Sequence, residues 1–123
     1  MSNNITTILT DTIVPQVTAQ LQPELQKFIV GGMIKGYLPQ TWIFVSETGA
    51  GTMVVDKNGV AQAQEGQLEN PDVRITWTDQ AFLAALVLQN RAAVPSGAGE
   101  PKVEKITSKG GTAFDFLRKR FNL

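Results

Sequence analysis

The groups of this sequence that could carry acid–base or nucleophilic chemistry are its carboxylates, its lysines and its single tyrosine, Tyr37. Histidine and cysteine are both absent. These two residue types supply the commonest general base, many activated nucleophiles and most zinc ligands. The composition therefore argues against an enzyme, and we predict no catalytic residue, no metal ligand and no cofactor.

The carboxylates lie in pairs along the chain, and each pair is explained more simply as solvated surface charge. The pairs flank predicted loops and strands: Glu65 with Glu69, Asp72 with Asp79, and Glu100 with Glu104. None shares the apolar neighbourhood that paired acid–base catalysis requires. One enzymatic alternative stays open. It is a small isomerase in a cone-shaped α+β fold, which would combine Tyr37 with a buried aspartate, either Asp56 or Asp115.

Two further classes of binding site lack support. Residues 97–101, Gly-Ala-Gly-Glu-Pro, open like a phosphate-binding loop. A strand is predicted to follow them, however, whereas a phosphate cradle needs the N-terminus of a helix. The chain carries eleven basic and eleven acidic residues, so its net charge gives no reason to expect a nucleic acid or an anionic membrane as a partner.

The length of 123 residues is enough for one hydrophobic core, so we expect a single domain, residues 1–123. Residues 1–14 lack the basic and continuous apolar regions of a secretory signal. No apolar run approaches the roughly eighteen residues that a membrane span needs. We therefore expect a cytoplasmic protein without integral membrane insertion.

The elements that must position these side chains begin with a helical segment, residues 1–36. Apolar residues recur there in steps of three and four, which indicates one helical face. They are Ile5, Ile8, Leu9, Ile13, Val17, Leu21, Leu25, Phe28 and Ile29. Pro15 and Pro23 each lack a backbone donor, so we expect breaks or kinks, with a fresh helix beginning at Pro23. The pair at 31–32, Gly-Gly, is the predicted end.

A region of four strands is predicted over residues 41–77. Residues 41–45 are apolar on both faces, as in a central strand. Strands at 52–56 and 60–65 flank an Asn-Gly pair, which is typical of a tight hairpin. The fourth strand, 73–77, alternates apolar and polar residues, which indicates that one of its faces meets water.

An apolar helix is predicted over residues 79–90, with Thr78 as its N-cap. From Ala81 to Leu88 it has no polar side chain. A helix that is apolar all round must be covered on every side, or must border something apolar that is not protein. Two interpretations stay open: the helix lies between the sheet and another helix, or it lines an apolar cavity.

Residues 102–121 are predicted to form a last strand, 102–108, a turn at 109–111, Lys-Gly-Gly, and a C-terminal helix, 112–121. The basic cluster at 118–120 suits the end of that helix. The order of elements is helix, three-strand meander, strand, helix, strand, helix. It favours an α+β fold with a five-stranded, mostly antiparallel sheet and helices on one face.

Two stretches resemble the sterol carrier protein type-2 family. They are residues 51–56, Gly-Thr-Met-Val-Val-Asp, and residues 70–83, Asn-Pro-Asp-Val-Arg-Ile-Thr-Trp-Thr-Asp-Gln-Ala-Phe-Leu. That family shows a strand ending in Asp, a Pro-Asp-Val strand and a Ser/Thr-Asp-capped helix with Phe-Leu. The order of elements from Leu21 to Phe121 also matches. After Arg91 the chain departs from the family, because a stretch rich in Ala, Gly and Pro replaces an aromatic pair.

The resemblance implies that the sheet and helices enclose an apolar tunnel for fatty acyl chains, sterols or similar lipids, which are bound or transferred without covalent chemistry. The expected ligand-binding residues are Phe82, Leu83, Leu86 and Val87 on the apolar helix, Phe114, Leu117 and Phe121 as a lid, and Ile43, Phe44 and Met53 on the sheet. The alternative is an interaction or scaffold module with the same fold, whose C-terminal helix docks a partner protein or a second copy in a homodimer.

Overall fold

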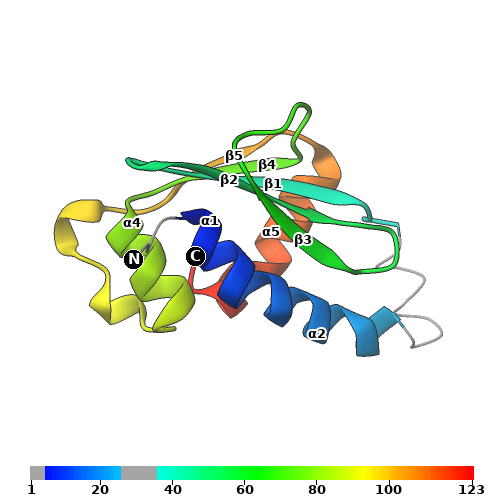
Figure 1. Ribbon diagram of the computed structural model, residues 1–123, viewed down its shortest axis with the longest axis horizontal. Coiled ribbons are helices and arrows are strands. Elements are labelled where there is room, and N and C mark those ends of the chain that lie inside the picture. The colour runs from blue at the N-terminus through cyan, green and yellow to red at the C-terminus, as the bar shows by residue number, and fades with distance from the viewer. Residues whose placement is uncertain (1–4, 26–35) are drawn as a thin grey trace.

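One mixed sheet of five strands carries the fold, and the helices gather on one side of it (Figure 1). The computed structural model describes residues 5–25 and 36–123. Across the sheet the strands are β3 (Ala61–Glu65), β2 (Gly49–Val55), β1 (Gln40–Ser46), β4 (Val73–Thr76) and β5 (Lys102–Lys105). β1 pairs with β4 in parallel, whereas the other neighbouring strands pair antiparallel. The predicted α+β fold with a mostly antiparallel five-stranded sheet is confirmed.

The centre of the sheet is buried on both faces, as the apolar first strand predicted. Trp42 and Phe44 point toward the helices and belong to the core cluster. Ile43 points to the opposite face and is fully buried there beside its β2 partner, Thr52. The Thr52 hydroxyl donates to the carbonyl of Gly66 (2.6 Å), so the loop after β3 lies over that face.

The β2–β3 connection is the tight hairpin that the Asn-Gly pair predicted. The backbone carbonyl of Asp56 accepts a hydrogen bond from the N–H of Gly59 (3.0 Å). Its carboxylate accepts two more, from the N–H groups of Asn58 (2.8 Å) and Val60 (3.0 Å). The turn therefore satisfies its own backbone donors without help from the rest of the chain.

The N-terminal helical segment consists of α1 (Ile5–Ile8), a π-helical segment (Leu9–Ile13) and α2 (Val14–Leu25). The wide π turns directly precede Pro15, which lacks the N–H that an α-helix would need there. The prediction that a fresh helix begins at Pro23 is wrong, because α2 continues through this residue. Pro23 is exposed and lies in the last turn described, where a lost backbone hydrogen bond costs less than in a buried interior.

The predicted apolar face of this segment is confirmed within the described residues. Its buried side chains are Ile5, Ile8, Leu9, Ile13 and Val17. α1 lies close against β2 at Gly51, where a Cβ atom would be 3.0 Å from Thr6 Oγ1 and 3.1 Å from Leu9 Cδ1. A side chain at position 51 would therefore require α1 to shift by a few tenths of an ångström. The predicted end of the helix at 31–32 lies outside the described residues.

The apolar run after β4 folds into α4 (Asp79–Phe82) and a π-helical segment (Leu83–Val87). Thr78 is the N-cap, as predicted, since its hydroxyl accepts a hydrogen bond from the backbone N–H of Ala81 (3.1 Å). The predicted end at Asn90 is wrong, because the helical run stops at Val87.

This run is apolar all round, but it is not covered all round. Its buried side chains are Ala81, Phe82, Ala84, Ala85 and Leu86. Val87 and Leu88 are 38% and 60% exposed, so the end of the run borders solvent on one side. Gln89 then adopts a φ of 52°, which is incompatible with a continued right-handed helix.

The last strand is shorter, and the last helix begins earlier, than the sequence predicted. β5 ends at Lys105, and α5 runs over Ser108–Leu117. Thr107 caps α5 by accepting a hydrogen bond from the N–H of Gly110 (3.0 Å), so the glycine pair that predicted a turn lies inside the helix. A 3-10 turn, Arg118–Phe121, follows α5.

Asp72, immediately before β4, joins the start of β1 to the start of α5. Its buried carboxylate accepts hydrogen bonds from the backbone N–H of Thr41 (2.9 Å) and the hydroxyl of Thr107 (2.7 Å). Its backbone carbonyl accepts from the N–H groups of Ile106 (2.9 Å) and Thr107 (3.2 Å). Gly110 lies directly against this carbonyl, and a Cβ atom there would overlap it.

We expect Gly110→Ala to lower the free energy of unfolding by about 2–3 kcal/mol, because the added methyl group forces α5 away from Asp72. Gly97→Ala is the control, since a Cβ atom there meets no atom within 4 Å. It should change the free energy of unfolding by less than about 0.5 kcal/mol. Urea unfolding followed by tryptophan fluorescence measures both variants, and equal stabilities would contradict the close approach of α5 to Asp72.

Candidate ligand-binding site

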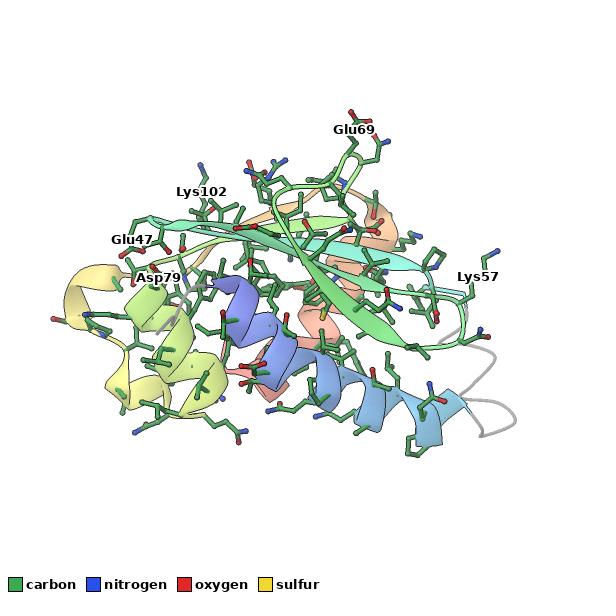
Figure 2. All side chains as sticks on the ribbon, in the orientation of Figure 1. Glu47, Lys57, Glu69, Asp79 and Lys102 are labelled. Carbon is green, nitrogen blue, oxygen red and sulfur yellow. The ribbon has the colours of Figure 1, made fainter. Side chains whose placement is uncertain are left out.

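The β1–β2 turn fixes the start of α4 and thereby places the apolar run under the sheet. The backbone N–H of Asp79 donates to Glu47 Oε1 (2.7 Å), and Asp79 Oδ2 accepts from the hydroxyl of Thr48 (2.6 Å). Figure 2 shows Glu47 and Asp79 close together at this end of the sheet. In the same view the side chains of Lys57 and Glu69 point outward, away from the space between the sheet and the helices.

Phe82 on α4 is the centre of an aromatic contact between helix and sheet. The centroid of its ring lies 5.8 Å from that of Phe44 on β1 and 5.9 Å from that of Trp77 after β4, both edge-to-face. Trp42 on β1 contacts Phe114 on α5, with 5.7 Å between ring centroids. The sheet, the apolar run and the last helix therefore meet in one apolar interior.

The predicted ligand-binding residues fall largely into this interior. The core cluster contains Phe44, Met53, Phe82, Leu86, Phe114 and Phe121, and Leu83 and Leu117 are partly buried against it. The structure thus brings together residues that are far apart in the sequence and that the tunnel hypothesis assigned to the sheet, the helix and the lid. Their contact with a ligand stays a prediction.

Two of the predicted residues lie elsewhere. Ile43 is on the opposite face of the sheet from Phe44, because successive side chains of a strand alternate. Val87 is exposed at the end of its π-helical segment. Ile43 therefore does not face the interior and Val87 borders solvent, so we leave both out of the candidate site.

A pocket of about 330 Å³ opens between β5, α5 and the residues that follow α5. Its lining residues are Glu100, Pro101, Val103, Lys105, Phe114, Arg118 and Leu123. Phe114 and Leu123 also belong to the core cluster, so one wall of the pocket is shared with the apolar interior. Charged side chains form part of the remaining lining, and Lys105 pairs there with Asp115 on α5 (2.7 Å).

Arg91 links the lining of this pocket to the end of the sequence. Its Nη2 donates to Glu100 Oε2 (2.6 Å), and its Cζ lies 5.0 Å from the centroid of the Trp77 ring, in a cation–π contact. Its Nη1 donates to the backbone carbonyls of Asn122 (3.2 Å) and Leu123 (3.1 Å). One guanidinium group therefore holds three separate parts of the chain together.

Sequence reasoning missed Val103, Leu123 and Arg91 as parts of the site. Val103 lies in a strand that is otherwise polar, and Leu123 follows the predicted end of the last helix, so neither carried a signal. Arg91 carried a weak one, because it opens the stretch that departs from the family pattern and has an opposite charge, Glu100, nine residues later.

The acids of the isomerase alternative are not buried. Asp56 is exposed in the β2–β3 hairpin, and Asp115 is exposed in its ion pair with Lys105. Tyr37 is 40% exposed. Neither aspartate is therefore the buried acid that this alternative requires.

Two further features are absent from residues 5–25 and 36–123. In that part of the chain, no group of three or more metal-ligating side chains could hold a metal ion. Nor does any helix described there have the length and apolar character to cross a membrane.

No protein-family model matches the chain, and no curated protein matches it. Among solved structures, the chain is similar to Sterol Carrier Protein 2 Like 2 from Aedes aegypti, at 13% identity over 85% of this chain and 92% of that one, with a TM-score of 0.48. It is also similar to the apo form of Sterol Carrier Protein 2 from Yarrowia lipolytica, at 13% identity over 95% and 99% of the two chains, with a TM-score of 0.39.

A third similar structure is a double mutant of the sec-alkyl sulfatase PisA1, at 24% identity over 64% of this chain and 13% of that one, with a TM-score of 0.39. Two of these three structures are sterol carrier proteins, which is the family that the sequence motifs resemble. At such identities and TM-scores the likeness carries no argument about the site, which therefore rests on the contacts of the chain itself.

We expect Phe82→Ala to lower the free energy of unfolding by about 3–5 kcal/mol, because it removes both aromatic contacts and leaves a cavity at the centre of the interior. Val87→Ala, at the exposed end of the same apolar run, should lower the free energy of unfolding by less than about 1 kcal/mol. Chemical denaturation measures both. A larger loss for Val87→Ala than for Phe82→Ala would show that the apolar run faces the other way.

Proposed function

We propose that this chain binds an apolar or amphipathic lipid-like ligand without covalent chemistry, and that it carries or transfers this ligand. The expected cargo is a fatty acyl chain, a sterol or a similar molecule. The site is the interior between the sheet and the helices, entered from the pocket beside β5 and α5. The observation that carries the proposal is the shared wall, since Phe114 and Leu123 line the pocket and also belong to the core cluster.

The size of the pocket suits one end of such a ligand. Its volume of about 330 Å³ lies near the lower limit of small-molecule sites, which span roughly 300–1,000 Å³. Each buried methylene contributes about 0.8 kcal/mol, so eight carbons contribute roughly 6 kcal/mol before the costs of ordering. Useful affinity therefore requires no charged side chain to anchor the ligand. The continuous apolar tunnel that the family resemblance implies remains part of the proposal.

The sequence motifs support the same function. Residues 51–56 and 70–83 resemble a family of sterol and lipid carriers, and they fold here into β2, β4 and the start of α4. These elements supply Met53 and Phe82 to the interior. The cytoplasmic location expected from the sequence stays a prediction.

Val103→Trp tests the entrance of the site. Val103 is only partly buried, so the larger side chain should fill the pocket with little effect on the fold. We expect this variant to raise the Kd of a pyrene-labelled fatty acid by about tenfold or more, because the indole occupies the pocket volume that one end of the probe would fill. Fluorescence titration measures the Kd.

Lys102→Trp is the matched control, because it adds the same indole to the neighbouring position of β5, which is exposed and does not line the pocket. Its Kd should stay within about twofold of the wild-type value. Equal affinities of the wild-type protein and Val103→Trp would contradict the pocket as part of the ligand site. Failure of the wild-type protein to bind the probe or to retain lipid through purification would contradict the carrier function.

An interaction module is a second candidate function, and one observation favours it. Phe116 on α5 is 72% exposed, and Ile106, just before α5, is 47% exposed. Aromatic side chains are enriched at protein interfaces relative to the rest of the protein surface. We infer that α5 presents Phe116 to a partner protein or to a second copy in a homodimer.

We expect Phe116→Ser to abolish concentration-dependent self-association, because it removes the exposed aromatic anchor while leaving Phe114 in the core. Sedimentation velocity over a range of concentrations measures the change. Thr112→Ala, exposed on the same helix, is the control and should leave self-association intact. A wild-type protein that stays monomeric at every concentration would refute the homodimer, and unchanged lipid binding in Phe116→Ser would separate the two functions.

A further inference from the structure

The last residues of the sequence, 118–123, lie partly inside the molecule. Phe121 and Leu123 are buried in the core cluster, although α5 has already ended at Leu117. Between them, Asn122 adopts a left-handed conformation with a φ of 59°, which asparagine tolerates better than most residues. The chain therefore leaves the direction of α5 and places two large apolar side chains in the interior.

Hydrogen bonds from side chains hold this segment in place. Arg91 Nη1 donates to the carbonyls of Asn122 (3.2 Å) and Leu123 (3.1 Å). Asn122 Nδ2 donates to the carbonyl of Ala85 (3.1 Å), within the apolar run. The backbone N–H of Leu123 turns back to the carbonyl of Arg118 (2.9 Å). These contacts can break without disturbing a strand ladder.

Arg91 also lies at the edge of the opening that a ligand would use. Its partner Glu100 lines the pocket, and so does Leu123, which Arg91 holds through its backbone carbonyl. Leu123 therefore separates the pocket from the core cluster, and its position depends on the side chain of Arg91. Moving residues 118–123 outward would join the pocket to the interior.

We propose that Phe121 and Leu123 occupy the inner part of the ligand site as a plug, and that Arg91 is the latch that holds this plug. The inference rests on the proposed function, because the plug and an apolar ligand compete for the same space. Ligand binding displaces residues 118–123, and the pocket beside Phe114 then extends toward Phe82. The apparent affinity is the intrinsic affinity multiplied by the fraction of molecules in which the site is open. The hydrogen bonds of Arg91 keep this fraction small, so they set the apparent affinity.

Arg91→Gln tests the latch, with the pyrene-labelled fatty acid as the probe. Glutamine cannot donate hydrogen bonds to both Glu100 and the carbonyls of residues 122 and 123, as the guanidinium group does. The fraction of molecules in which the site is open therefore rises. We expect the Kd for the probe to fall by roughly fivefold or more. Arg74→Gln is the matched control, because it removes an ion pair with Glu104 (2.9 Å) at a side chain of similar exposure, 33% against 36% for Arg91. Its Kd should stay within about twofold.

The outcomes separate the plug from the carrier function. If the wild-type protein binds the probe and Arg91→Gln binds it no more tightly, the plug is overturned and the carrier function stands. If neither protein binds the probe, both proposals fail. Binding that appears only after Arg91 is replaced supports the plug and contradicts the carrier function of the wild-type protein.

A second measurement does not depend on the folding of Arg91→Gln. The chain has no cysteine, so Leu123→Cys introduces a single thiol, and a buried thiol reacts slowly. We expect saturating probe to raise the rate of reaction of this thiol with a water-soluble disulfide reagent by about tenfold or more, because the ligand expels the plug. An unchanged or slower rate shows that residue 123 stays inside when the ligand is bound, and it overturns the plug.

Discussion

A buried carboxylate before β4 decides how the elements of this protein come together. Burying a charged carboxylate is costly unless hydrogen bonds replace the water it loses. The donors that Asp72 uses come from Thr41 in β1 and Thr107 before α5. These residues are 31 and 35 positions away in the sequence. The carboxylate is therefore satisfied only when β4 lies beside β1 and when the chain returns from β5 into α5 at the same place.

The contacts of Asp72 also position the elements that form the candidate site. With β4 parallel to β1, the chain leaves the sheet at Trp77 and turns under it, which places the ring of Phe82 against that of Phe44. With α5 seated on Asp72 through Gly110, Phe114 reaches Trp42 on the same side of the sheet. The interior and the pocket share a wall because one junction positions the two elements that form it.

Local signals in the sequence were strong enough to predict several elements. The Asn-Gly hairpin, the Thr78 cap and the doubly buried central strand follow from short-range turn chemistry, capping and alternation, and all three are confirmed. Errors arose where local patterns conflicted with tertiary contacts. Pro23 does not start a helix, and the glycines at 110 and 111 do not form a turn. At position 110 only glycine fits against Asp72, so this contact offsets the low helix propensity of glycine there.

The sequence by itself determined the fold class and the apolar character of the residues at the candidate site, since periodicity and composition act over a few neighbouring positions. It also identified Phe44, Met53, Phe82, Leu86, Phe114 and Phe121, which the structure collects in one cluster. Strand alternation alone places Ile43 and Phe44 on opposite faces. Only the tertiary structure decided which of the two faces the helices, that Leu123 lies inside, and that Arg91 holds it there. These facts depend on strand register and on contacts between residues far apart in the chain, and no local pattern encodes such contacts.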